Sequence, residues 1–138
     1  MSLNRLFLIG VSILVLIGVI YYFATAQGRL MAANEVLAIS HLQSILREES
    51  NQRVGGKSYI SLNELGKSDG SIPQAGQVVN GYRFDVRIKG DGERFEAIAV
   101  PAEYDRTGRQ SFYGDETGKI RAADKRGAEC NSNDPELF

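Results

Sequence analysis

Residues 6–50 read LFLIGVSILVLIGVIYYFATAQGRLMAANEVLAISHLQSILREES, and they set the architecture of the chain. The first part, Leu6–Ala26, contains 21 residues and no charged side chain. At about 1.5 Å per residue, a helix of this length spans roughly 30 Å, the thickness of the hydrocarbon core of a bilayer. Aromatic residues at positions 21–23 lie near the end of the run, where such rings favour the membrane interface. The pattern predicts a transmembrane segment within residues 1–27.

Three interpretations of this apolar run compete. A buried core helix without a polar face does not suit so small a protein. A cleavable signal peptide is compatible with Ala24-Thr25-Ala26, which fits the small-residue pattern before a cleavage site. The run is longer than the usual apolar region of about 7–15 residues, however, and aromatic residues directly precede the site. We therefore expect an uncleaved signal anchor, whose orientation is weakly specified because Arg5 and Arg29 flank it.

The residues that follow the apolar run change from wholly apolar to amphipathic. No proline interrupts residues 6–49, so we expect one long helix in which residues 28–52 pack on a domain. The paired Gly55 and Gly56 should end this helix. His41 lies beside the apolar stripe and is interpreted as a boundary residue rather than a metal ligand. The stripe itself consists of Ala32, Val36, Ile39, Leu42 and Leu46.

A short helix and a loop are expected next. In SLNELG, Ser61 can cap a helix while the side chain of Glu64 reaches back to it. Gly66 suits a left-handed stop for that helix. Residues 67–81, KSDGSIPQAGQVVNG, are predicted to be loop from their composition.

The rest of the domain is predicted to form an antiparallel sheet of about four strands over residues 82–122. Strict alternation of apolar and polar residues predicts a strand with one buried face at 82–88. The strand at 94–100 carries apolar residues on both faces, which indicates that it is central or covered on both sides, and Pro101 ends it. A last pair of short strands, 111–113 and 119–121, flanks the sequence GDETG, and a turn at 90–92 joins the first two. The predicted fold class is α+β.

Composition leaves room for one small domain beyond the membrane segment. The chain has 138 residues, with 16 Lys and Arg against 17 Asp and Glu, so its near-neutral charge gives no indication of a nucleic-acid partner. We expect three parts: the anchor at 1–27, the domain at 28–127 and a polar C-terminal tail at 128–138. The single cysteine, Cys130, lies in that tail, where an exposed thiol would either pair between chains or stay free.

No catalytic site is predicted. The carboxylates of Glu96, Glu103 and Asp105 fall in a strand and loop whose charged residues are expected to face water. Ser111 has no histidine nearby in the sequence, and no glycine-rich stretch matches a phosphate-binding or dinucleotide fingerprint. We expect no enzyme activity. The polar side chains of Tyr104, Arg106 and Arg109 form either a recognition patch or a solvated loop.

Several motifs in the C-terminal half resemble, in order and spacing, the type IV pilin and type II secretion pseudopilin superfamily. They are NGYRFDV at 80–86, FEAIAVPAEY at 95–104 and GRQSFYGDETGKIR at 108–121, and YISLNELG at 59–66 resembles the segment after the long helix of that family. The resemblance covers residues 28–127. It implies one N-terminal transmembrane helix that continues as an amphipathic half and packs on a small antiparallel sheet.

The N-terminus departs from the pattern of that family. A prepilin carries a basic leader, then a glycine or alanine where the prepilin peptidase cuts, then an apolar helix with a glutamate at its fifth position. Here Gly10 lies between Ile9 and Val11 without a basic run beside it, and Leu6–Ala26 contains no glutamate. That buried glutamate helps to place the next subunit, and a carboxylate in lipid is costly unless paired. We therefore expect a permanent anchor rather than a main filament subunit.

The resemblance implies a single-pass protein of a bacterial inner membrane, with its domain in the periplasm or outside the cell. Its partners would be the lipid bilayer and other pilin-like or secretion subunits, as for an accessory component of a type IV pilus or type II secretion apparatus. The alternative is an exported or tethered soluble binding module that uses loops 67–81 and 101–110.

Major pseudopilins often hold calcium in their C-terminal loops, and the available oxygen ligands here are Asp91, Asp115 and Glu116. No EF-hand-like run is present, and hairpin-turn chemistry explains all three residues. We therefore expect no metal and no other cofactor, and the acidic residues of SFYGDETGKIRAAD, 111–124, are predicted to form a solvated turn.

Overall fold

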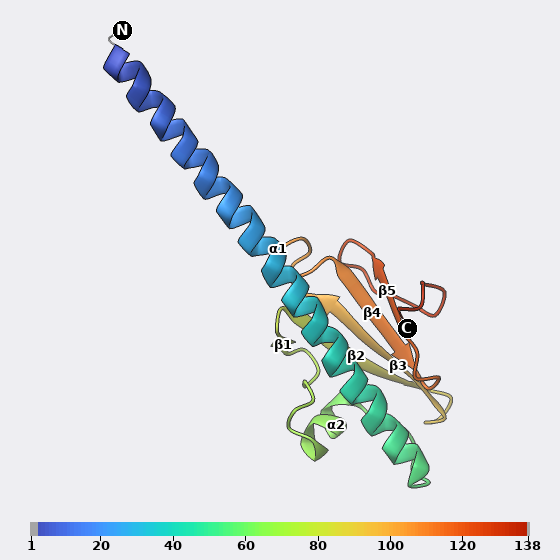
Figure 1. The fold of residues 1–138 in the computed structure, drawn as a ribbon. Coiled ribbons are helices and arrows are strands. Elements are labelled where there is room, and N and C mark those ends of the chain that lie inside the picture. Colours follow the sequence, from blue (N-terminus) through green and yellow to red (C-terminus); the bar gives the residue numbers. More distant parts are fainter. Residues whose placement is uncertain (1–2, 138) are drawn as a thin grey trace. The chain divides into compact units, whose positions relative to one another are not determined.

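The computed structural model describes residues 3–137, which form a long helix, a short helix and one antiparallel sheet (Figure 1). The chain divides into two compact units, Met1–Leu30 and Met31–Phe138, which are described separately. The predicted α+β class is confirmed. The elements are α1 (Leu3–Val54), α2 (Leu62–Ser68), β1 (Val78–Val79), β2 (Tyr82–Lys89), β3 (Arg94–Pro101), β4 (Gln110–Asp115) and β5 (Ile120–Asp124).

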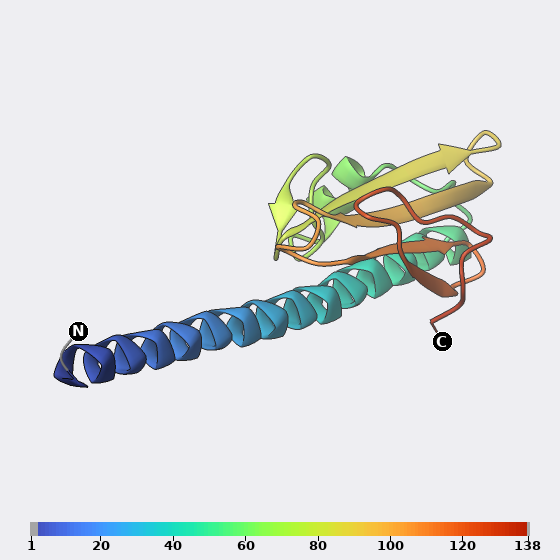
Figure 2. The ribbon, with the colours of Figure 1, turned by 90° about the horizontal axis from the view of Figure 1, so that it is seen from above.

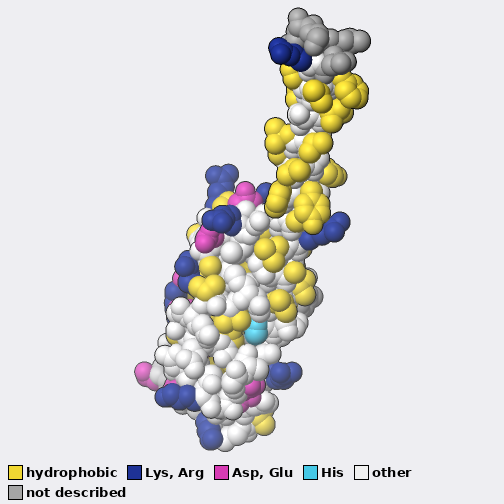
Figure 3. Space-filling model, turned by 90° about the vertical axis from the view of Figure 1, so that its left-hand side faces the viewer, with side chains coloured by type: hydrophobic (Ala, Val, Ile, Leu, Met, Phe, Trp, Pro, Cys, Tyr) yellow, Lys and Arg dark blue, Asp and Glu magenta, His cyan; other side chains and the backbone are white. Residues whose placement is uncertain are grey.

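The first unit is the apolar part of α1. It is long and apolar enough to cross a membrane by its length and composition. Its large apolar side chains are exposed, and they cover the segment that Figure 3 shows in yellow. The hydroxyls of Ser12 and Thr25 donate to the carbonyl oxygens of Leu8, at 2.9 Å, and Tyr21, at 3.0 Å. Because these hydroxyls are satisfied within the helix, they add little cost in a lipid environment.

In the second unit, the C-terminal half of α1 lies along one face of the sheet (Figure 2). Leu42 and Leu46 of the predicted stripe are buried there, but Ala32 and Val36 are exposed, so the predicted stripe is wrong at its N-terminal end. The helix presents polar side chains to the domain at that end instead. The helix ends at Val54 before Gly55-Gly56, as predicted. The buried face consists of Ala38, Leu42, Ile45, Leu46 and Glu49.

The sheet has five antiparallel strands in the order β1-β2-β3-β4-β5. β3 is the central strand, as its apolar residues on both faces predicted, and it pairs with β2 along its whole length, from Tyr82↔Pro101 to Lys89↔Arg94. Gly114 on β4 lets the helix pack closely, because a Cβ at this position would lie only 2.9 Å from Cδ1 of Leu46. The inward side chains form the core: Tyr82, Phe84, Val86, Phe95, Ala97, Ala99, Phe112 and Ile120.

The fifth strand corrects the expectation of about four strands and of a loop throughout 67–81. β1 pairs with β2 through Val79↔Tyr82 and Val78↔Arg83. The two residues between them, Asn80 and Gly81, have φ values of 49° and 74°. Both lie in the left-handed region that a type I′ turn requires, and Asn-Gly is the residue pair that this turn favours. The turn therefore forms a short hairpin from a segment whose composition is otherwise that of a loop.

The short helix α2 confirms one prediction and corrects another. The side chain of Glu64 accepts a hydrogen bond from the backbone N–H of Ser61, at 2.9 Å, as the predicted capping arrangement requires. It also accepts one from the Ser61 hydroxyl, at 2.7 Å. Gly66 does not stop the helix, which continues to Ser68. A Cβ at Gly66 would lie 3.3 Å from the carbonyl oxygen of Ile72, so this glycine allows the following loop to pack closely.

The C-terminal segment packs against the sheet, and Cys130 is buried rather than exposed as expected. Cys130 lies with Ile98 and Tyr113 in a small cluster on the face of the sheet opposite α1, here called the outer face. Residues 134–137 run beside β5, where Leu137 N donates to the Ile120 carbonyl oxygen at 2.8 Å. Most side chains of residues 128–137 are polar because they face the solvent. The few residues that attach the segment to the sheet cannot be recognised from this composition.

Candidate functional site

The C-terminal half of α1 keeps one face open. We call the residues Ala32, Ala33, Val36 and Leu37 the free face; all are exposed, and 66% of Val36 is accessible. They lie on the side of the helix opposite Ala38 and Leu42, which pack on the sheet. An exposed apolar strip on a helix whose other side is already packed is typical of an interaction surface. Its small alanines permit close approach of a second helix.

The helix also fixes the loop at residues 102–110 with two polar side chains, Asn34 and Glu35. Nδ2 of Asn34 donates to the Thr107 carbonyl oxygen at 2.9 Å. Oε1 of Glu35 accepts from the backbone N–H of Arg109, at 2.8 Å, and of Gln110, at 3.2 Å. Hydrogen bonds to a charged acceptor are stronger than neutral ones. We call this arrangement the loop clamp, and it holds a loop that composition alone suggests is free.

Removing the Glu35 carboxylate should weaken the loop clamp. Glu35→Ala is expected to lower the free energy of unfolding by about 2 kcal/mol, because the N–H groups of Arg109 and Gln110 lose their acceptor. Chemical denaturation of the full chain in detergent measures this change. Glu35→Gln keeps an oxygen acceptor and should recover at least half of the loss. Equal stability of the alanine variant and the unchanged protein would show that the clamp contributes nothing.

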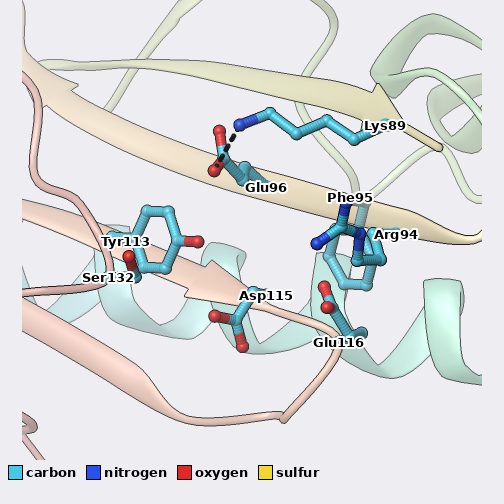
Figure 4. Close-up of a pocket in the computed structure, with 8 residues that line it drawn as sticks. All are labelled: Lys89, Arg94, Phe95, Glu96, Tyr113, Asp115, Glu116 and Ser132. Carbon is cyan, nitrogen blue, oxygen red and sulfur yellow. Dashed lines mark ion pairs between the residues drawn. The ribbon is translucent and has the colours of Figure 1, made fainter.

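A polar pocket of about 300 Å³ lies on the outer face of the sheet (Figure 4). Glu96 on β3 and Asp115 on β4 are directly opposite in the strand register. Nζ of Lys89 lies 2.6 Å from Oε1 of Glu96 and compensates that charge. Tyr113 turns its hydroxyl into the space between the two carboxylates. Burial raises the pKa of the Tyr113 hydroxyl, and the nearby Asp115 raises it further, so the phenol stays protonated as a hydrogen-bond donor.

The pocket contains positively and negatively charged groups that can form hydrogen bonds. Among residues 3–137, they form no catalytic arrangement that we can recognise. The one histidine of the chain, His41, lies elsewhere, against Phe84 on the α1 side of the sheet, with ring centroids 5.6 Å apart. A hydroxyl of this pocket thus has no imidazole base beside it. The arrangement suits the binding of a small polar group better than acid–base chemistry.

The acidic residues considered for calcium lie in or directly beside turns. Asp91 is in the β2–β3 turn with φ 55°, and Asp115 accepts a hydrogen bond from the backbone N–H of Thr117 at 3.0 Å in the β4–β5 turn, beside Glu116. Gly118, with φ 76°, completes that turn as predicted. Over residues 3–137, no three His, Cys, Asp or Glu side chains gather closely enough to hold a metal ion.

The residues considered for catalysis or recognition in loop 101–110 form contacts with one another. Arg106 pairs with Glu103 at 2.7 Å, and Arg109 pairs with Asp105 at 2.6 Å. The Tyr104 hydroxyl donates to Asp124 at 3.1 Å. The hydroxyl of Ser111, far from His41 in the fold, donates to the Ala128 carbonyl oxygen at 2.6 Å and so holds the C-terminal segment. These groups stabilise the loop and the segment.

Sequence reasoning missed one buried acid, Glu49 on α1. Its side chain is 0% exposed. Oε2 accepts a hydrogen bond from the backbone N–H of Ile60 at 3.2 Å, and Oε1 has no partner among the described residues. Burial raises the pKa of Glu49 to about 7. The signal available in the sequence was the spacing Ala38-Leu42-Ile45-Glu49, which puts the acid on the packed face.

Comparison with known proteins assigns no family to the chain. No family model, curated protein or solved structure matches it. Function is therefore inferred from the residues and contacts described above.

Proposed function

We propose that this chain is a membrane-anchored, pilin-like structural or interaction protein. It acts as an accessory component of a type IV pilus or type II secretion apparatus, by packing its helix and domain against partner subunits. It is held in a bacterial inner membrane with its domain in the periplasm or outside the cell. It has no catalytic role in this proposal.

The free face of α1 is the observation that carries the proposal. The helix packs on its own sheet through Leu42 and Ile45, and in the part of the chain that the structure describes, no element covers Val36 and Leu37. Within the apolar run, Gly10 and Gly18 meet nothing within 4 Å where a Cβ would lie. Small residues on membrane helices admit close neighbours, so both parts of the helix offer contact positions.

The motifs at 80–86 and 108–121 support a pilin-like assignment through their resemblance to that superfamily. The two departures, at the cleavage site and at the missing glutamate of the apolar helix, favour an accessory subunit over a filament subunit. The arrangement of one long helix packed on an antiparallel sheet is compatible with this assignment.

A charge on the free face should remove the partner without unfolding the domain. Val36→Glu is expected to reduce co-purification of membrane partners after mild crosslinking by at least tenfold, because an unpaired carboxylate would be buried in the contact. The melting temperature of the isolated full chain should stay within about 2 °C, since Val36 is exposed.

Val54→Glu is the matched control. Val54 lies on the same helix, 18 residues beyond Val36, and is 87% exposed. Because it is not one of the free-face residues, its variant should retain the partners. Equal recovery of partners with both variants would contradict a contact at the free face, as would recovery of a lone monomer from the unchanged chain.

An exported soluble binding module is a second candidate, favoured by the outer-face pocket. This pocket is a polar recess on the sheet. It is lined by Glu96 and Asp115, which are opposite each other on β3 and β4, and by Lys89 and the Tyr113 hydroxyl. This function does not need the apolar helix after export. Cleavage after Ala26 in the native cell envelope, detected by N-terminal analysis, would favour this candidate over the first.

A further inference from the structure

Glu49 holds the segment that joins the two helices of the second unit. We call residues 55–61 the connector. Besides the bond from Ile60 N to Glu49, the connector is fixed by Lys57 N, which donates to the Gln52 carbonyl oxygen at 3.1 Å, and by Tyr59 N, which donates to the Gly92 carbonyl oxygen at 3.1 Å. Of these three contacts, only the one to Glu49 involves a group that can change its charge. Ser61, at the end of the connector, also binds the carboxylate of Glu64, but these hydrogen bonds lower the pKa of Glu64, so it keeps its charge from pH 6 to pH 8.

The surroundings of Glu49 disfavour its charged form. The inner face of the sheet carries apolar side chains, and no cation forms an ion pair with Glu49 among residues 3–137. The charged groups that act on it are Glu48 of α1 and Glu64 of α2, both of the same sign. Arg53, one helical turn after Glu49, lies over the ring of Tyr59, 5.8 Å from its centroid. Arg47, two residues before Glu49, is exposed.

A carboxylate in this position would have one hydrogen bond where it needs several. Within residues 3–137, Oε1 receives no hydrogen bond, and the solvent is excluded from the whole side chain. A buried charge with so few partners costs several kcal/mol, whereas the neutral acid costs much less. The ionised group can gain water only if the connector moves away from α1.

We propose that Glu49 is a pH-sensitive latch: as a neutral acid it holds the connector and α2 against α1, and as a carboxylate it releases them. The latch lies in the second unit and does not depend on the partner contacts proposed above. Leu62 and Leu65 attach α2 to the core, so release exposes apolar surface next to the end of α1.

The direction of the effect follows from proton linkage. The closed state binds the proton of Glu49 with a pKa of about 7, against 4.5 for an exposed glutamate. The closed state therefore binds more protons than the open state, and closure weakens as pH rises from 4.5 to 7 and levels off above 7. From pH 6 to pH 8, the opening constant should rise about tenfold.

Hydrogen exchange of the full chain in detergent tests the latch. The exchange rates of residues 57–68, divided by the chemical rates at each pH, should rise about tenfold between pH 6 and pH 8. In Glu49→Gln, which retains an acceptor for Ile60 N but has no titrating group, the corrected rates should not change with pH. The strands β3 and β4 in the same sample serve as an internal reference.

Glu48→Gln is the matched control, since Glu48 is the neighbouring carboxylate and its side chain is half-buried. This variant should keep the pH dependence with a small shift. A pH-independent exchange rate in the unchanged protein would overturn the proposal. So would a pH dependence that survives in Glu49→Gln, because another group would then be responsible. If Glu49→Gln does not fold, a pH-independent exchange rate in the unchanged protein still overturns the proposal.

Discussion

Arginine at positions 14 and 17 together is expected to move the protein from the membrane fraction to the soluble fraction. Leu14 and Ile17 lie near the middle of the apolar run and are both exposed. Each arginine at the centre of a membrane helix costs about 2.5–3.5 kcal/mol for insertion, so Leu14→Arg with Ile17→Arg costs roughly 6 kcal/mol. Fractionation followed by alkaline extraction of the membranes measures the change.

The control for this double variant exchanges apolar residues only. Leu14→Ile with Ile17→Leu retains the hydrophobicity of the run and should stay in the membrane. Retention of the double-arginine variant after alkaline extraction would contradict the anchor, because a segment other than the apolar run would then hold the protein in the bilayer.

The second large effect is expected at Gly108, where the loop after β3 passes the ring of Tyr82. A Cβ at Gly108 would lie 2.7 Å from Cζ of Tyr82 and closer still to its Oη. The ring is 0% exposed, and its hydroxyl donates to the Gln110 carbonyl oxygen at 2.8 Å, so it has no room to move. Gly108→Ala should lower the free energy of unfolding by about 3 kcal/mol, through overpacking and the loss of this bond.

Gly70→Ala is the comparison for this substitution. A Cβ at Gly70 meets nothing within 4 Å, so the change should stay within about 0.5 kcal/mol. Urea denaturation of both variants as full chains in detergent gives the two values. Equal stabilities of the variants would mean that the loop and the ring of Tyr82 are not packed as described.

The elements that local patterns control were predictable. The alternation in Tyr82-Arg83-Phe84-Asp85 sets which face of β2 is buried, because successive side chains point to opposite faces of a strand. The end of α1 before Gly55 follows equally from a local cost of paired glycines in a helix. These features depend on neighbours within a few positions, which the sequence displays directly.

The polar contacts of α1 were not predictable in the same way. Asn34, Glu35 and Glu49 lie on or beside the packed face because of partners distant in the sequence, such as Thr107 for Asn34. An apolar stripe identifies the face that hydrophobic burial favours, and these polar residues shift the real face toward themselves. Only the three-dimensional arrangement shows that their partners exist.

The prediction of a polar tail at the C-terminus was wrong for a related reason. Its polar composition suggested a solvated tail, yet Arg87 on β2 binds Glu129 through two nitrogens, at 2.8 and 2.6 Å. Ser111 on β4 donates a hydrogen bond to the segment, and Cys130 of the segment is buried against the sheet. From the sequence alone, Arg87 and Glu129 are each expected to be solvated. Only the fold shows that they bind each other.

The measurement that tests the central claim most directly is the intact mass of the protein extracted from the membranes of its native cells. We predict a mass that includes residues 1–26, in the membrane fraction, because the apolar helix is a permanent anchor. A mass that lacks residues 1–26, in the soluble fraction, would contradict it and make the binding module the better account. A mass that lacks residues 1–10 would also contradict it, since processing after Gly10 would indicate a filament subunit.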